Sequence, residues 1–128
     1  MKGFTNSLVY LNGGFYKKAV GIENGRIAYI GDDYSAITES LDKADCKSYL
    51  VPGFIDEHIH GAGGSDAMDG TEKALKTISD TLVKEGTTSF LFTTMTASPE
   101  KTKASLVAAD GFIGKYNKQE ENGTVTGA

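Results

Sequence analysis

The two histidines of the chain lie two residues apart, at His58 and His60, inside a short apolar segment. Side chains alternate between the faces of a β-strand, so an extended segment over 54–60 places both imidazoles on one face, about 6.6 Å apart at Cα. Both could then reach one metal ion, for which neutral imidazole is a common ligand. The sequence predicts a pair of metal ligands, although a bare His-x-His pattern also fits two polar residues at a strand end.

Two carboxylates accompany this pair. Asp56 shares the face of the histidines and could support a ligand imidazole by accepting its second N–H. A solvent-exposed or strand-capping carboxylate is the alternative for Asp56. Glu57 points to the opposite face and is expected to be a surface residue rather than a ligand. No residue of the chain is expected to be catalytic in its own right.

The elements around the histidines alternate between strand and helix. The strand over 54–60 is followed by a glycine-rich loop, by an amphipathic helix over roughly 72–85 and by an uncharged β-prone strand over 87–94. A second helix opens at Ser98-Pro99 and carries Leu106, Val107, Phe112 and Ile113. This order predicts adjacent parallel strands with helical crossovers, and it places the histidines at the carboxyl end of the first strand. A polar loop over 117–123 and a third strand over 124–126 follow.

A glycine-rich loop is expected over 61–70, and its flexible first part, 61–64, is expected to lie over the site. It lacks the Lys-Ser/Thr ending of a phosphate-binding loop and carries Asp66 and Asp69, so close backbone approach is favoured over anion binding. Asp69 and Glu72 have the spacing of a capping box for the following helix.

The first third of the chain predicts β-hairpins. Asn12-Gly13 and Asn24-Gly25 separate β-prone segments over 7–11, 15–22 and 26–30, and Asn-Gly favours tight turns with positive φ. We therefore expect a small antiparallel sheet before residue 51.

Composition excludes several classes of function. The net charge of −4, without a basic cluster, argues against nucleic acid as a partner. No apolar stretch is long enough for a membrane span or a signal core, so no membrane partner and a cytoplasmic location are expected. Cys46 is the only cysteine, which excludes an internal disulfide and favours a buried structural thiol over a nucleophile.

Three segments carry a resemblance to a known family. Residues 51–61 (VPGFIDEHIHG) resemble the first-strand signature of the amidohydrolase superfamily. Residues 61–69 (GAGGSDAMD) and 85–94 (EGTTSFLFTT) are similar to the N-acetylglucosamine-6-phosphate deacetylases in particular. The resemblance implies an α/β fold in which residues 1–50 form the N-terminal part of a β-sandwich and residues 51–128 form the first units of a truncated (β/α)₈ TIM barrel. A whole barrel needs about 250 residues, so the chain is expected to be an N-terminal fragment.

The resemblance also implies an activity. The full-length enzyme would use one or two divalent ions, zinc or iron, to deacetylate N-acetylglucosamine 6-phosphate, a small amino-sugar phosphate, and would form a homodimer. His58 and His60 would be ligands in it, while the fragment alone would be inactive. Two alternatives stay open: another amidohydrolase that acts on a cyclic amide C–N bond, and a non-catalytic metal-binding or structural fragment.

Overall fold

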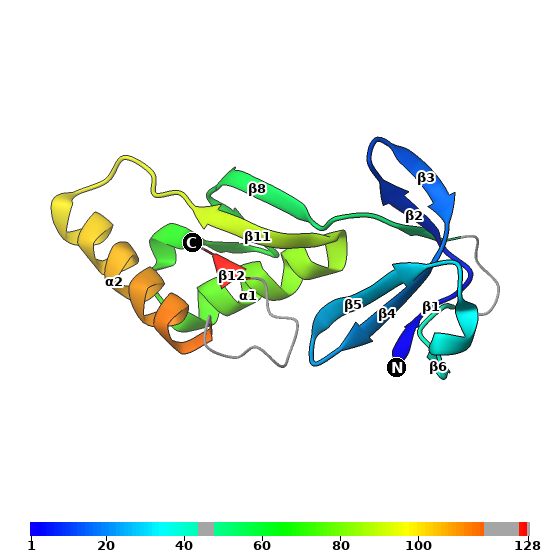
Figure 1. Ribbon diagram of the computed structural model, residues 1–128. Helices are drawn as coiled ribbons and strands as arrows, with labels where there is room; N and C mark the ends of the chain where they lie inside the picture. Colours follow the sequence, from blue (N-terminus) through cyan, green and yellow to red (C-terminus); the bar gives the residue numbers. More distant parts are fainter. Residues whose placement is uncertain (44–47, 117–125, 128) are drawn as a thin grey trace. The chain divides into compact units, whose positions relative to one another are not determined.

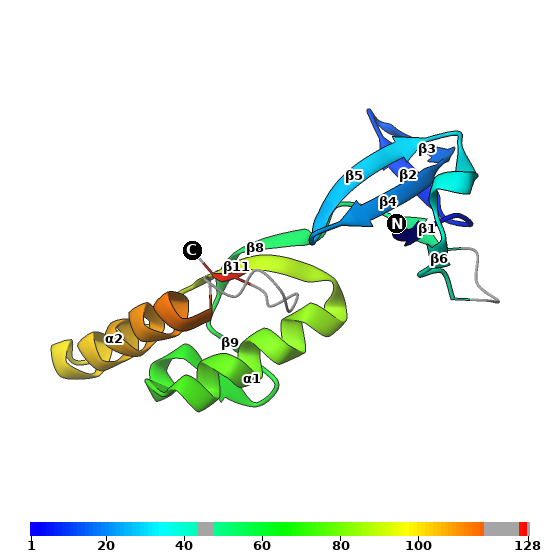
Figure 2. The ribbon, with the colours of Figure 1, turned by 60° about the horizontal axis from the view of Figure 1, so that its bottom comes forward.

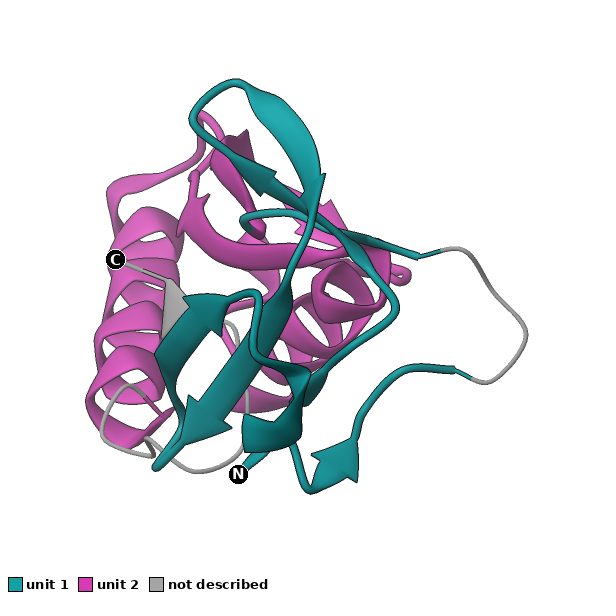
Figure 3. Ribbon diagram, turned by 45° about the vertical axis from the view of Figure 1, so that its right-hand side comes forward, with its two compact units in different colours: residues 1–52 teal, residues 53–128 magenta. Residues whose placement is uncertain are grey.

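The computed structural model describes residues 1–43, 48–116 and 126–127 and has a mixed α/β structure. The chain divides into two compact units, residues 1–52 and residues 53–128 (Figure 3). The interpretation of Cys46 and the loop expected over 117–123 lie outside the described residues.

Two hairpins dominate the first unit. The first joins β2 (Leu8–Leu11) to β3 (Gly14–Lys17), and the second joins β4 (Ala19–Glu23) to β5 (Arg26–Gly31). Asn12 and Gly13 have φ angles of 48° and 86°, and the pair at 24–25 has angles of 52° and 72°. Both hairpin turns predicted from Asn-Gly are confirmed, because two successive residues with positive φ match the strand twist.

The first unit holds two sheets, so the expectation of one small antiparallel sheet was wrong. The strand expected over 15–22 is interrupted at Lys18, which forms an ion pair with Asp32, and the chain there passes from one sheet to the other. The sheets have the orders β5-β4-β1-β6 and β3-β2-β7, with β1 (Lys2–Phe4), β6 (Glu39–Ser40) and β7 (Tyr49–Leu50). β6 pairs in parallel with β1, and β7 pairs in parallel with β2. A 3₁₀ turn, η1 (Tyr34–Ala36), follows β5.

The half-buried carboxylate of Asp42 holds the turn between β1 and β2. It accepts hydrogen bonds from the backbone N–H groups of Thr5 and Asn6 at 2.6 and 3.0 Å, and from the hydroxyls of Thr5, Ser7 and Ser40. Partial burial raises the pKa of the Asp42 carboxyl, but these hydrogen bonds together outweigh burial and lower it to about 2. The ionised carboxylate therefore stabilises the first unit.

We expect this unit to lose stability between pH 4 and pH 2. Because the pKa of Asp42 is lower in the folded chain than the ordinary 3.8, its contribution is complete above pH 4 and disappears as the pH falls toward 2. About 1 kcal/mol should be lost, after an allowance for solvent screening. Urea unfolding followed by near-UV circular dichroism measures it, because five of the six tyrosines lie in residues 1–52. Asp42→Asn should lack this pH-dependent component, and an unchanged pH profile in that variant would contradict the assignment.

The second unit is built on a parallel sheet. β8 (Phe54–Ile59) pairs in parallel with β11 (Thr87–Phe92), and β11 pairs in parallel with β12 (Thr126–Gly127), in the order β12-β11-β8. β8 and β11 are connected through α1 (Glu72–Leu82) and the 3₁₀ turn η3 (Val83–Glu85), and α2 (Pro99–Tyr116) follows β11. Both helices lie on the same side of the sheet (Figures 1 and 2). The predicted strand-helix-strand order and parallel pairing are confirmed.

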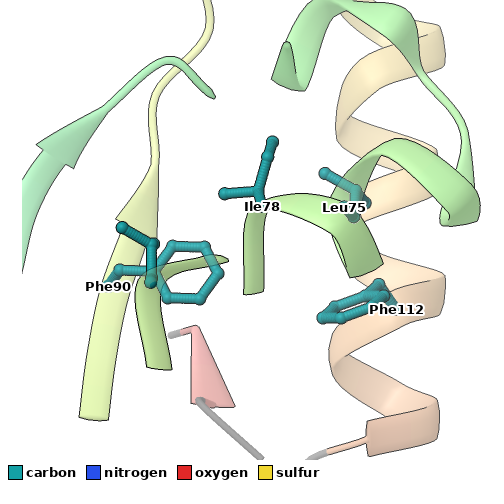
Figure 4. Packing of buried hydrophobic residues seen from close by; sticks show 5 residues of the cluster. Leu75, Ile78, Phe90 and Phe112 are labelled. Atoms are coloured by element: carbon teal, nitrogen blue, oxygen red, sulfur yellow. The ribbon is translucent and has the colours of Figure 1, made fainter. Parts of the chain in front are cut away.

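The core of the second unit lies between the sheet and its two helices. Leu75, Ile78 and Leu82 of α1 pack with Phe90 of β11 and Phe112 of α2, all at most 7% exposed. Figure 4 shows Ile78 and Leu75 of α1 beside Phe90 of β11 and Phe112 of α2. The predicted apolar face of α1 is thus confirmed.

The ends of α1 agree only partly with expectation. Gly86 has a left-handed conformation, with φ 84°, and ends the helical segment formed by α1 and η3, as expected. The N-cap is Thr71, whose hydroxyl accepts from the N–H of Ala74, so the capping box expected between Asp69 and Glu72 was wrong. Asp69 instead forms a capping box with Asp66 around the 3₁₀ turn η2 (Ala67–Asp69). Two adjacent helical turns compete for the same acidic residues, and sequence spacing does not decide between them.

Helix α2 starts at Pro99 as predicted, but two of the four apolar residues predicted for it, Leu106 and Val107, are exposed. Only Ser105 and Phe112 are buried, whereas Leu106 and Val107 are 56% and 63% exposed. Within the described residues, no helix is long and apolar enough to cross a membrane.

Candidate metal site

A local irregularity of β8 positions the histidines. Asp56 stands opposite Phe90 of β11 and Ile59 stands opposite Phe92. On β8, two residues, Glu57 and His58, lie between Asp56 and Ile59. On β11, a single residue lies between Phe90 and Phe92. β8 thus carries a β-bulge just before its carboxyl end, a feature that redirects side chains. The strict alternation assumed from sequence is interrupted here.

The two imidazoles nevertheless converge, as predicted. Their ring centroids are 4.9 Å apart, the rings are perpendicular, and the Nε2 atoms of His58 and His60 are 3.3 Å apart. His58 is exposed and His60 is half-buried. The same ring nitrogen of each histidine faces the other, at the carboxyl end of the strand.

The end of β11 orients His60. Nδ1 of His60 lies 2.8 Å from the carbonyl oxygen of Thr93, which can only accept, so Nδ1 carries the hydrogen. The N–H of Thr93 donates to the carbonyl of Ile59 at 3.0 Å. In the neutral ring, Nε2 is then the unprotonated nitrogen with its lone pair directed toward His58.

This arrangement fits a divalent metal ion. Two nitrogens at about 2.0–2.1 Å from a tetrahedral zinc ion lie roughly 3.3–3.4 Å apart. The separation of the two Nε2 atoms, 3.3 Å, agrees with that value. Ligand histidines also commonly donate their other N–H to a carbonyl or carboxylate, as His60 does to Thr93. The donor set can hold zinc or ferrous iron.

His58 and His60 alone supply too few ligands for a complete metal site. Among the residues that the structure describes, no group of three or more His, Cys, Asp or Glu side chains could surround an ion. The Asp56 carboxylate accepts the backbone N–H of His58 at 3.1 Å, whereas the imidazole N–H of His60 is bound by the carbonyl of Thr93. Glu57 is exposed. The ligand roles of His58 and His60 and a supporting role of Asp56 stay predictions.

The glycine-rich segment begins with a short β-hairpin. β9 (Gly61–Ala62) pairs with β10 (Ser65–Asp66), and the N–H of Ala67 donates to the carbonyl of His60 at 2.7 Å. Gly63 and Gly64 form the turn with φ of 62° and 80°. Gly63 lies against Thr81 of α1, so the hairpin packs on the helix, and paired strands take the place of the expected loop over 61–66.

This packing predicts unequal costs for two neighbouring substitutions. Gly63→Ala should lower the free energy of unfolding by about 2–3 kcal/mol, because it combines a positive φ with a close approach to Thr81. Gly64→Ala has a positive φ but open space around the new Cβ and should cost about 1 kcal/mol. Urea unfolding of both variants measures the difference. Equal costs would show that the turn does not press on α1.

Sequence reasoning missed Thr93 as part of the site. Its contribution is a main-chain carbonyl, which every residue possesses. Its place in the sequence could have indicated this role, because Thr93 follows the parallel strand β11, whose carboxyl end lies beside that of β8.

No family model matches the chain. The chain is 41% identical over 91 residues to an N-acetylglucosamine-6-phosphate deacetylase of Bacillus subtilis, a match that covers 70% of this chain and 23% of the relative. It superposes on the deacetylase structure from Pasteurella multocida with a TM-score of 0.71 at 25% identity, covering 91% of this chain and 31% of that one.

These relatives are N-acetylglucosamine-6-phosphate deacetylases. A second deacetylase structure, from Thermotoga maritima, agrees with a TM-score of 0.69 at 30% identity and covers 90% of this chain and 29% of that one. The resemblance found from the sequence is therefore confirmed. The chain spans less than a third of the length of each of these deacetylases.

Similarity extends beyond the deacetylases. The chain is 33% identical over 90 residues to an allantoinase of Bacillus licheniformis, with 67% of this chain and 18% of the relative covered. Enzymes named for different reactions thus share this part of the sequence.

Proposed function

We propose that this chain contributes the first metal-binding strand of an N-acetylglucosamine-6-phosphate deacetylase, with His58 and His60 as ligands to a divalent ion. The observation that carries the proposal is the 3.3 Å separation of the two Nε2 atoms, with Nδ1 of His60 donating to Thr93. In the complete protein, the reaction is hydrolysis of N-acetylglucosamine 6-phosphate to glucosamine 6-phosphate and acetate.

His58 and His60 would each supply one nitrogen ligand to the ion. His60 presents one lone pair from a ring that Thr93 holds in a fixed tautomer, and His58 presents the second from the bulge of β8. A divalent ion bound there supplies Lewis-acid polarisation of the amide carbonyl and activation of water at neutral pH. Asp56 accepts a backbone N–H, and we assign the proton transfer to the departing amine to a group outside this cluster.

We further propose that residues 53–128 are the first units of a (β/α)₈ barrel and that residues 1–52 are part of a β-sandwich. The order β12-β11-β8, with both helices on one side, supports the barrel. Phe54 and Ile55 on the outer strand β8 are 63% and 70% exposed, as expected if further elements complete the sheet. A homodimer and a cytoplasmic location belong to the same proposal.

Zinc or ferrous iron is the proposed metal, in one or two ions, and the amino-sugar phosphate is the proposed ligand. The similarity to an allantoinase favours one alternative, an amidohydrolase for a cyclic amide. The two histidines would serve both enzymes in the same way, because the metal chemistry is shared and the pocket selects the substrate.

A chimera tests the proposal. The matching 91-residue segment of the Bacillus subtilis deacetylase is replaced by that of this chain, and acetate release from N-acetylglucosamine 6-phosphate is measured. We expect an active chimera that loses at least about 10²-fold in kcat/KM in the His60→Ala variant, because metal and ligand are lost together. Glu57→Ala is the matched control and should retain activity. A folded chimera that is inactive, or that is indifferent to His60→Ala, would refute the proposal.

A further inference from the structure

The bulge in β8 has a built-in support. Bulges leave a residue of the strand without its regular ladder partner. The N–H of His58 lies within the bulge and donates to Oδ1 of Asp56, two residues earlier, at 3.1 Å. The Asp56 side chain thereby closes a local turn of the kind that carboxylates form with the backbone two residues ahead.

We propose that Asp56 is a positioning residue that acts through this bulge: its carboxylate fixes the backbone of His58 and so sets the direction of the His58 imidazole toward His60. This assignment rests on the proposed metal site but differs from an imidazole-orienting carboxylate, because the contact is to the main chain. His60 is oriented from the other side of the pair, by Thr93 on β11.

Each histidine is thus held from a different strand: His58 by Asp56 of β8, and His60 by Thr93 at the end of β11. Register pairing of Ile59 with Phe92, and the hydrogen bond from Thr93 to the carbonyl of Ile59, fix the chain just after the bulge. The pairing of Asp56 with Phe90 fixes the chain just before it. Between these points the Asp56 carboxylate binds the backbone N–H of His58, so its removal should free the bulge but leave the flanking pairs intact.

Three variants of residues 1–128 separate this role from others. Asp56→Ala removes the acceptor, Asp56→Asn keeps an acceptor oxygen in the same place, and Glu57→Ala removes the neighbouring, exposed carboxylate of the same bulge. We expect hydrogen exchange at the His58 amide to accelerate about tenfold in Asp56→Ala alone, as one lost hydrogen bond implies. Zinc affinity by calorimetry should fall about 10- to 100-fold in that variant and stay near the parent value in the other two.

A measurement on the unaltered chain covers the case in which Asp56→Ala does not fold. A scalar coupling across the hydrogen bond, between the His58 amide nitrogen and the Asp56 side-chain carbon, should be detectable by NMR. Its absence, together with an unprotected His58 amide, overturns the proposal, as does a loss of zinc affinity in Asp56→Asn or Glu57→Ala equal to that in Asp56→Ala. If the parent chain binds no zinc while exchange and coupling behave as expected, the bulge assignment stands and the proposed metal function fails.

Discussion

Residues 1–128 alone are expected to release no measurable acetate from N-acetylglucosamine 6-phosphate. A catalytic zinc site usually has three protein ligands and an open position, whereas the described residues bring two histidines together and no third ligand. The acid-base group proposed for the complete enzyme also lies outside this histidine pair. Loss of acid-base assistance alone costs about 10²- to 10⁴-fold in rate. We therefore expect a rate below about one thousandth of that of an intact deacetylase.

The measurement is an acetate-release assay with added zinc or ferrous iron, with the Bacillus subtilis enzyme as the positive control. His58→Ala supplies the matched negative control, since it removes one exposed ligand without touching the core. Turnover by residues 1–128 that disappears in His58→Ala would show that the chain is a working enzyme by itself and that the account of an incomplete site is wrong.

Phe90→Ala should unfold the second unit or bring it close to unfolding. Phe90 is 1% exposed on the central strand of the sheet and packs against the core residues of both helices (Figure 4). Truncation of a buried phenylalanine costs about 3–5 kcal/mol, since the apolar contacts are lost and a cavity remains. That is a large part of the 5–15 kcal/mol typical of a whole domain.

Val107→Ala is the control for this prediction. Val107 is 63% exposed on α2, so its truncation should change the free energy of unfolding by less than about 0.5 kcal/mol. Urea unfolding followed by far-UV circular dichroism compares the variants. Equal effects of the two substitutions would mean that the core does not lie between β11 and the helices.

Sequence patterns were sufficient where one local rule decides the outcome. Asn-Gly favours tight turns with positive φ, and it correctly predicted the positions of both hairpin turns. The spacing of Leu75, Ile78 and Leu82 located the buried face of α1, because helical period and burial coincide there. The parallel order followed from alternating strand and helix.

Other features depend on contacts between distant residues. The sheet change at Lys18, the hairpin packed on Thr81 and the bulge before His58 result from partners that local sequence does not specify. The convergence of the imidazoles was predicted from strict alternation, whereas the structure reaches it through a bulge. Thr93 acts through its carbonyl, so its side chain gave no signal.

The most direct test of the metal site is a zinc titration of ¹⁵N-labelled residues 1–128, observed through the imidazole nitrogens by long-range ¹H–¹⁵N NMR. If both Nε2 lone pairs bind the ion, the Nε2 signals of His58 and His60 should shift together, and the shift should be complete at one zinc ion per chain. Nδ1 of His60 should keep its hydrogen and its hydrogen bond to the carbonyl of Thr93. Zinc that leaves both histidines unchanged, that shifts only one of them, or that binds through Nδ1 of His60 would contradict the account.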